Sequence, residues 1–272
     1  MTTTAATTKQ GYAGSSQPAF HDLLRSEWIK IRTVRSTGWC LALFTLITIG
    51  IATLVALNRN ADASTGSRVP VDGIVTGGTL GVAAGQLAIV VFAASAIGGE
   101  YGSGMIRTSL SAVPWRRRWL AAKALVVALT ALAAGAVVNA VSFAVGCVVA
   151  PGVSGALMDP GVVRAVLGGG LYLSGLALLT LAVATVVRGT AGAVVTMSAL
   201  IYVVPFLLLG SGFESVQRFL PVGLGPGSAG WAIMQPGPML GGLAPWSGFA
   251  VLCAWAVVAM TGALYAVEKR DV

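Results

Sequence analysis

Long apolar runs alternate with short polar segments along most of the chain. Apart from Lys123, six of these runs carry no charge, and each is close to or longer than the roughly 20 residues that a helix needs to cross a bilayer. They predict spans at 38–57, 77–99, 120–150, 165–187, 190–210 and 246–267. The third run is longer than a membrane needs, so we expect it to tilt or to project beyond the bilayer. The pattern predicts an all-α integral membrane protein with six transmembrane helices.

A basic amphipathic segment precedes the first span. At 100° per residue, one face of a helix over 20–36 collects Phe20, Leu23, Leu24, Trp28, Ile31 and Val34. This predicts an interfacial helix, with Trp28 at the headgroup level and the basic residues facing phosphates. Glu27 breaks the apolar face, and two interpretations stay open. It is either a solvated residue paired with Lys30 or Arg32, or a residue that docks another cytoplasmic element.

Residues 1–19 are rich in Thr, Ala, Ser and Gly and lack the apolar core of a signal peptide. We expect a disordered cytoplasmic tail there, followed by a single membrane domain over 20–272.

The connection between the second and third spans is the largest on its side of the membrane. Glu100, Gly102 and Gly104 precede a short apolar stretch that Pro114 ends. This order predicts a turn and a short helix over about 103–113. Such a helix is either a plain interfacial loop element or a surface on which a cytosolic partner acts. The basic cluster 116–118 that follows favours a topology anchor over a ligand site.

The segment 211–245 differs from an ordinary outer loop. It holds five of the chain's eleven prolines and many glycines, yet only Glu214 and Arg218 are charged. Irregular backbone at membrane depth must be buried against protein or line a wet cavity. We therefore expect broken or re-entrant helices that dip into the outer leaflet, and a loose outer loop is the alternative.

Composition and charge agree with a membrane protein. The chain is 56% hydrophobic and 10% charged, with a mean hydropathy of +0.85, too few charges to cover a water-exposed surface. Thirteen of the 17 Lys and Arg residues fall on the side that holds both termini, the second-to-third loop and the fourth-to-fifth turn. Positive residues favour the cytoplasm, so both termini are expected there. The net charge of +8 is spread between apolar runs and does not indicate nucleic-acid binding.

Small residues recur every four positions in two spans. Gly77, Gly81 and Gly85 do so in the second span, and Ala131 and Gly135 lead to an amide, Asn139, in the third. This spacing lets helices approach closely. The amides Asn139 and Gln86 could face a pathway, but hydrogen bonding between helices is the favoured interpretation.

The sequence lacks the residues that several kinds of transport and catalytic chemistry require. No span has Asp, Glu or His near its centre, which argues against an ion-coupled carrier. No Lys is followed by Ser or Thr, so the chain has no P-loop, and its single histidine, His21, excludes His-based triads and metal sites. The three cysteines lie singly in apolar runs. We expect no catalytic, cofactor-binding or metal-binding residues, and a separate subunit would supply the energy for transport.

From about Phe20 onward, this order of features resembles the membrane subunits (permeases) of type-2 ABC exporters. The matching local motifs are SEWIKIR (26–32) before the first span and EYGSGMIRTSLSAVP (100–114), with Lys123 beyond. Met105 stands where that family often has Thr. The family has an N-terminal connecting helix, a cytoplasmic coupling helix between spans two and three, and two re-entrant helices between spans five and six. The Ala-, Gly- and Val-rich composition resembles that of a bacterium with a GC-rich genome.

The resemblance implies a multi-pass protein of the bacterial cytoplasmic membrane that exports an amphipathic or hydrophobic substrate (drug, lipid or peptide). A soluble ATP-binding cassette subunit would bind and hydrolyse ATP, and a second permease copy, identical or similar, would complete the pathway among membrane lipids. The implied contacts with the ATPase subunit are Glu27, Glu100, Tyr101, Arg107 and Ser111. A self-contained carrier or channel, or a membrane scaffold protein, is the alternative function.

Overall fold

The computed structural model describes residues 19–63, 71–105, 116–150, 159–208, 214–223, 227–237 and 242–269, and every regular element in these ranges is helical. Six helical stretches are long and apolar enough to cross a membrane. They are α2 (Arg35–Ala63), α3 (Val71–Gly102), α5 (Arg116–Val149), α6 (Pro160–Val187), the stretch from α7 (Thr190–Ser198) through α8 (Val204–Leu208), and α10 (Pro245–Lys269). By helix length and hydropathy, the protein is a multi-pass membrane protein.

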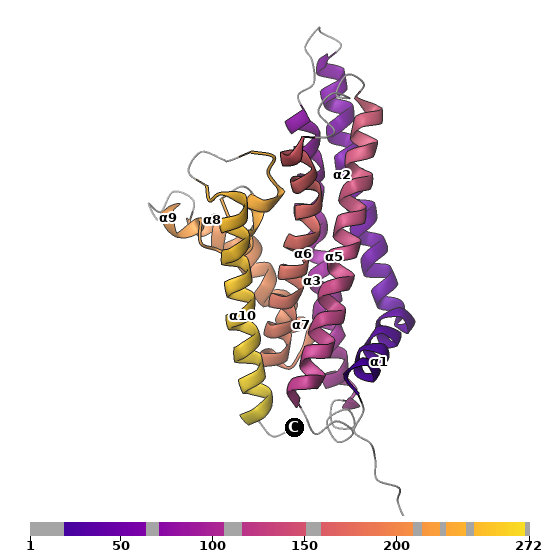
Figure 1. The fold of residues 1–272 in the computed structure, drawn as a ribbon, viewed down its shortest axis with the longest axis vertical. Coiled ribbons are helices and arrows are strands. Elements are labelled where there is room, and N and C mark those ends of the chain that lie inside the picture. Colours follow the sequence, from indigo (N-terminus) through magenta and orange to yellow (C-terminus); the bar gives the residue numbers. More distant parts are fainter. Residues whose placement is uncertain are drawn as a thin grey trace, which may run out of the picture.

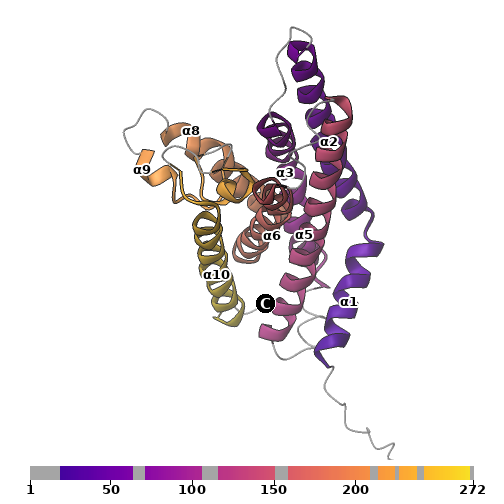
Figure 2. The ribbon, with the colours of Figure 1, turned by 45° about the horizontal axis from the view of Figure 1, so that its top comes forward.

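The helices form an elongated bundle in which α3 and α6 are central (Figure 1). The most apolar windows of α3 and α6 are 67% buried, against 22% for α2, the α7–α8 stretch and α10. Turning the molecule shows α10 and α8 set apart from α2 and α5, with α6 between them (Figure 2). The peripheral helices therefore present apolar side chains outward, as helices do when lipid or another apolar surface surrounds them.

Glycines let the helices pack closely, as their spacing predicts. A Cβ added at Gly81 on α3 would lie 2.4 Å from the backbone oxygen of Thr48 on α2. A Cβ at Gly135 on α5 would lie 2.8 Å from the Cα of Gly170 on α6. Because the contacts are with backbone atoms, no side chain fits at these positions without the helices moving apart.

The buried amides join helices. The Tyr172 hydroxyl of α6 donates to Gln86 Oε1 of α3 at 2.7 Å, and both side chains are fully buried. Asn139 of α5 packs directly against Gly169 of α6. The expectation that these amides serve helix–helix contacts is confirmed for Gln86 by its hydrogen bond and is supported for Asn139 by its packing.

Several helix boundaries differ from the predicted ones. The N-terminal helix α1 ends at Thr33, not at residue 36, because Val34 is extended, and α2 begins at once at Arg35. The fourth helix begins at Pro160, five residues before the predicted start, because Asp159 caps it by accepting a hydrogen bond from the Gly161 N–H at 2.7 Å. The fifth stretch contains a π-helical segment, η2 (Ala199–Val203), just before Pro205, whose ring disfavours the regular α-helical ladder.

The described parts of the outer segment are largely irregular. They contain two short pieces, α9 (Glu214–Gln217) and the 3-10 helix η3 (Gly230–Met234). Residues 221–223 and 228–234 are buried, whereas Val216 and Phe219 are 49% and 53% exposed. Trp231 and Ile233 of η3 are buried, and η3 packs against α6 and α10. These short helical pieces are consistent with the expected broken helices, and re-entry of the segment into the outer leaflet stays a prediction.

Two predicted features lie mainly outside the described residues. The N-terminal tail is described only at Ala19, and the short helix expected over about 103–113 is described only as far as Met105. Within that part, α3 ends at Gly102, and Gly104 adopts a positive φ of 71° that glycine tolerates well.

Candidate functional site

The N-terminal helix α1 (Phe20–Thr33) lies beside the lower part of α5, at the end of the bundle where α10 ends (Figure 1). Its buried residues are Leu23 and Glu27, while Trp28 and Ile29 are each 50% exposed. The face toward the bundle is therefore the stripe that contains Leu23, Glu27 and Lys30, which are three or four residues apart and share one side of a helix.

Both interpretations of Glu27 hold in part. It does pair with Lys30, whose Nζ lies 2.7 Å from Glu27 Oε1, but it is only 4% exposed and is not a solvated residue. It also docks α1 onto another element, because its Oε2 lies 2.6 Å from Lys123 Nζ on α5.

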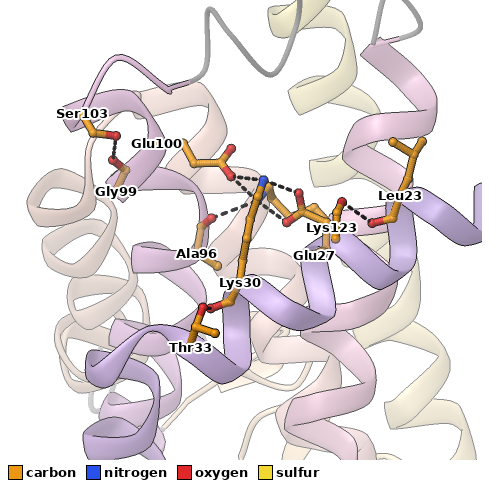
Figure 3. Close-up of polar contacts among 10 residues, drawn as sticks. Leu23, Glu27, Lys30, Thr33, Ala96, Gly99, Glu100, Ser103 and Lys123 are labelled. Atoms are coloured by element: carbon orange, nitrogen blue, oxygen red, sulfur yellow. Dashed lines mark hydrogen bonds and ion pairs between the residues drawn. The ribbon is translucent and has the colours of Figure 1, made fainter. Parts of the chain in front are cut away.

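Glu100, near the end of α3, completes a network of two carboxylates and two ammoniums (Figure 3). Its Oε1 accepts hydrogen bonds from Lys30 Nζ and Lys123 Nζ, each at 2.9 Å. Lys123 also donates to the Ala96 carbonyl at 3.1 Å, and its side chain is 2% exposed. The four side chains come from three helices that are distant in sequence, and their formal charges cancel. The network therefore fixes the positions of α1, α3 and α5 relative to one another.

One oxygen in this network is left over. The three N–H groups of Lys123 match its three acceptors, and both oxygens of Glu27 accept a lysine. Glu100 Oε2, in contrast, is buried and has no hydrogen-bond partner among the described residues. A buried carboxylate oxygen without a donor is costly, so this atom indicates a place for a further donor.

The network shifts the titration of the two α1 groups. Burial raises the pKa of Glu27, but the Lys123 and Lys30 ammoniums outweigh this effect and hold the pKa below its ordinary value of 4.5. Burial lowers the pKa of Lys30, but its hydrogen bonds to Glu100 and Glu27 outweigh that effect and keep the pKa above its ordinary value of 10.5. Both groups are therefore charged throughout the physiological range.

We expect these shifts to give an acid-sensitive stability. The Glu27 contribution is complete above pH 4.5 and is lost as the pH falls through the lowered pKa of the folded state, and the Lys30 contribution is complete below pH 10.5. Between about pH 6 and 9, the detergent-solubilised chain should show a constant unfolding midpoint, which should decrease below pH 4.5. The Glu27→Gln variant should show a smaller acid-induced decrease. A midpoint that changes between pH 6 and 8 would contradict this assignment.

A cavity of about 310 Å³ adjoins the network. The four charged residues form one wall. The other walls come from the start of α2, from the last turns of α3 and from apolar side chains of α1 and α5. The pocket therefore combines an ion-paired wall with apolar surface, a pattern typical of sites that take amphipathic ligands.

The structure brings together two of the five predicted ATPase-contact residues. Glu27 and Glu100 share the network, whereas Tyr101 is half-buried with the Arg188 guanidinium 6.0 Å from its ring centroid. Arg107 and Ser111 lie outside the described residues. Contact of these five residues with an ATPase stays a prediction. Sequence reasoning missed the role of Lys123, although a lysine within an apolar run is itself an indication of a buried partner.

The basic cluster at the start of α5 contacts the C-terminal helix. Arg116 donates to the Val267 carbonyl at 2.5 Å, and Arg117 pairs with Glu268 at 2.5 Å. Arg116 thereby satisfies a carbonyl of the last turn of α10. The network and this contact lie at the same end of the molecule, where α1 lies, α5 begins and α10 ends (Figure 1).

The chain matches no family model, and a search of curated proteins finds no match.

Proposed function

We propose that this chain is the membrane subunit of an ATP-driven exporter of the type-2 ABC kind, with ATP hydrolysed by a separate soluble subunit. The observation that carries the proposal is the buried network of Glu27, Lys30, Glu100 and Lys123. It ties the N-terminal helix α1 to the ends of two long spans, close in sequence to the predicted coupling segment at 103–113.

This geometry suits transmission of movement from an external subunit. The predicted coupling segment follows α3 directly, and Glu100 lies in the last turn of α3. Because Glu100 and Glu27 share the same lysines, a displacement of this segment would move α1, α3 and α5 together. Mechanical work would then enter the spans by contact, and the chain would need no catalytic residue of its own.

Burial divides the predicted contact residues into two groups under this proposal. Glu27 and Glu100 are 4% and 7% exposed, so they would support the docking surface from within the chain. Tyr101, Arg107 and Ser111 would then contact the ATPase directly. Charge reversal at Glu100 is for this reason a poor probe of docking, because it would place a third positive charge beside Lys123, which is buried, and Lys30, which is partly buried.

Exposed apolar side chains on three helices support the proposal that lipid and a second permease copy surround this chain. Leu46 on α2 and Phe206 on α8 are each 72% exposed, and Val258 on α10 is 63% exposed. Lipid and a second permease copy, identical or similar, would cover these faces in the bacterial cytoplasmic membrane. Thirteen of the 17 Lys and Arg residues fall in the segments predicted to share one side with both termini, and this distribution supports a cytoplasmic location for that side. The cargo would be an amphipathic or hydrophobic molecule.

We expect a P-loop ATPase to co-purify with this chain from its native membrane in mild detergent, in about equal amount. The Arg107→Glu variant should lose most of the co-purified ATPase, because charge reversal on the coupling segment opposes docking by several kcal/mol. The measurement is the ratio of ATPase to permease after purification, together with ATPase activity.

Arg59→Glu provides the matched control, because Arg59 is exposed at the opposite end of the bundle. This variant should retain the ATPase. A chain that purifies alone would contradict the exporter proposal and favour a self-contained carrier, a channel or a scaffold. Equal retention of the ATPase by both variants would contradict the coupling assignment.

A further inference from the structure

Among the described residues, the network beside the cavity leaves one acceptor and one donor unused. The acceptor is Glu100 Oε2, which is buried and unpartnered among the described residues. The donor comes from Lys30, which uses two of its three N–H groups on Glu27 and Glu100 within the described part of the chain. The Lys30 side chain is 34% exposed, so its remaining N–H can reach a ligand.

The rest of the lining suits a small polar head attached to an apolar body. Ser95 and Ser103 add hydroxyl oxygens on the α3 wall, while Ile31, Val34 and Val127 supply apolar surface. The volume of about 310 Å³ is at the lower end of the range for small-molecule sites.

Charge decides between ligand classes. A lone cation at Glu100 Oε2 would face the ammoniums of Lys30 and Lys123, and a lone anion near Lys30 would face two carboxylates. A zwitterion whose primary ammonium donates to Glu100 and whose anionic group accepts from Lys30 satisfies both spare groups and leaves the site neutral.

We propose that this cavity binds a primary-ammonium zwitterionic headgroup of the phosphoethanolamine class, carried by an aminophospholipid. The position of the network relative to the bilayer indicates that a lipid supplies this headgroup. With 34 residues, α5 is about 51 Å long, which exceeds the roughly 30 Å hydrocarbon core, so the network near its start lies at headgroup level. The inference rests on the membrane assignment alone and is independent of the exporter proposal.

The test compares two lipids that differ in hydrogen-bond donors. The full chain, purified in detergent, is titrated with phosphatidylethanolamine or phosphatidylcholine, and bound lipid is counted by native mass spectrometry. Phosphatidylcholine has the same two charges but no N–H. Phosphatidylethanolamine should therefore bind about tenfold more tightly at one site, the effect expected of one charge-assisted hydrogen bond.

A matched pair of glycine variants locates the site. Gly99 lines the cavity, and an added Cβ would meet nothing within 4 Å, so Gly99→Leu adds an apolar side chain at the cavity lining without a clash at its Cβ and without removing a network residue. Gly102 is equally open but does not line the cavity. Gly99→Leu should lose the preference for phosphatidylethanolamine, and Gly102→Leu should keep it.

A further titration with soluble phosphoethanolamine separates the two sources of this headgroup. Displacement of the lipid only at a large excess supports a lipid ligand. Displacement at equal concentration still supports the headgroup chemistry but overturns the lipid as its source. Equal binding of the two lipids, or full binding of phosphatidylethanolamine by Gly99→Leu, would overturn the proposal.

Discussion

Replacing Lys123 with methionine should lower the free energy of unfolding by about 3–5 kcal/mol, the usual effect of removing one partner from a buried ion pair. The Lys123 side chain is 2% exposed and joins Glu27 at 2.6 Å and Glu100 at 2.9 Å. Without it, two buried carboxylates share the single ammonium of Lys30. Circular dichroism is used to measure the free energy of unfolding of each variant in mixed detergent micelles.

Two further variants distinguish loss of charge balance from a general effect of the substitution. Lys269→Met makes the same change at the exposed end of α10, where the lysine ammonium lies 4.8 Å from the centroid of the Tyr265 ring, and it should cost less than about 1 kcal/mol. Adding Glu27→Gln to Lys123→Met leaves Lys30 facing Glu100 alone and should recover part of the loss. A Lys123→Met variant as stable as Lys269→Met would refute the role assigned to the network.

Replacing Gly81 with alanine should cost about 1–3 kcal/mol, the usual range for overpacking, although the change adds only one methyl group. That methyl would lie 2.4 Å from the Thr48 backbone oxygen and 3.0 Å from its Cα, so α2 and α3 would have to separate. The same separation would weaken the hydrogen bond from the Thr48 hydroxyl to the Gly81 carbonyl, which is 3.3 Å long. The same unfolding assay measures the change.

Gly50→Ala on α2 serves as the matched control. Nothing lies within 4 Å of a Cβ added at Gly50, so this variant should be neutral or more stable by up to about 1 kcal/mol, because alanine favours helix more than glycine does. If Gly81→Ala were as stable as Gly50→Ala, the α2–α3 contact would not be as close as described here.

The boundaries of the helices could not be predicted from hydropathy alone. Hydropathy identifies the stretch that lipid requires, but backbone hydrogen bonding continues until a cap or a turn stops it. The α6 helix accordingly begins at Asp159 and Pro160 rather than at the first fully apolar turn. The α5 helix likewise begins at Arg116, within the basic cluster. There, water and the Val267 carbonyl of α10 can accept hydrogen bonds from the arginine side chains.

The candidate site was visible in the sequence only as separate residues. Glu27 and Lys30 are three apart on a helix, so their pairing follows from helical geometry. Glu100 and Lys123 flank a loop between consecutive spans, and antiparallel packing can bring such residues together. Neither pattern indicates that both pairs meet in one network, or that Glu100 keeps an oxygen without a partner in the described part of the chain.

Hydropathy along the chain predicts the six apolar helices, and the spacing of small residues predicts the close approach between helices. The uneven distribution of basic residues can likewise be read from the sequence. These properties are local, because bilayer thickness, helical periodicity and side-chain size act on neighbouring positions of one segment. The ion pairs that join α1 to α3 and α5, and the cavity beside these ion pairs, depend on how the helices are arranged in three dimensions. The reason is physical: burial and charge compensation depend on which side chains three separate helices bring within hydrogen-bond distance.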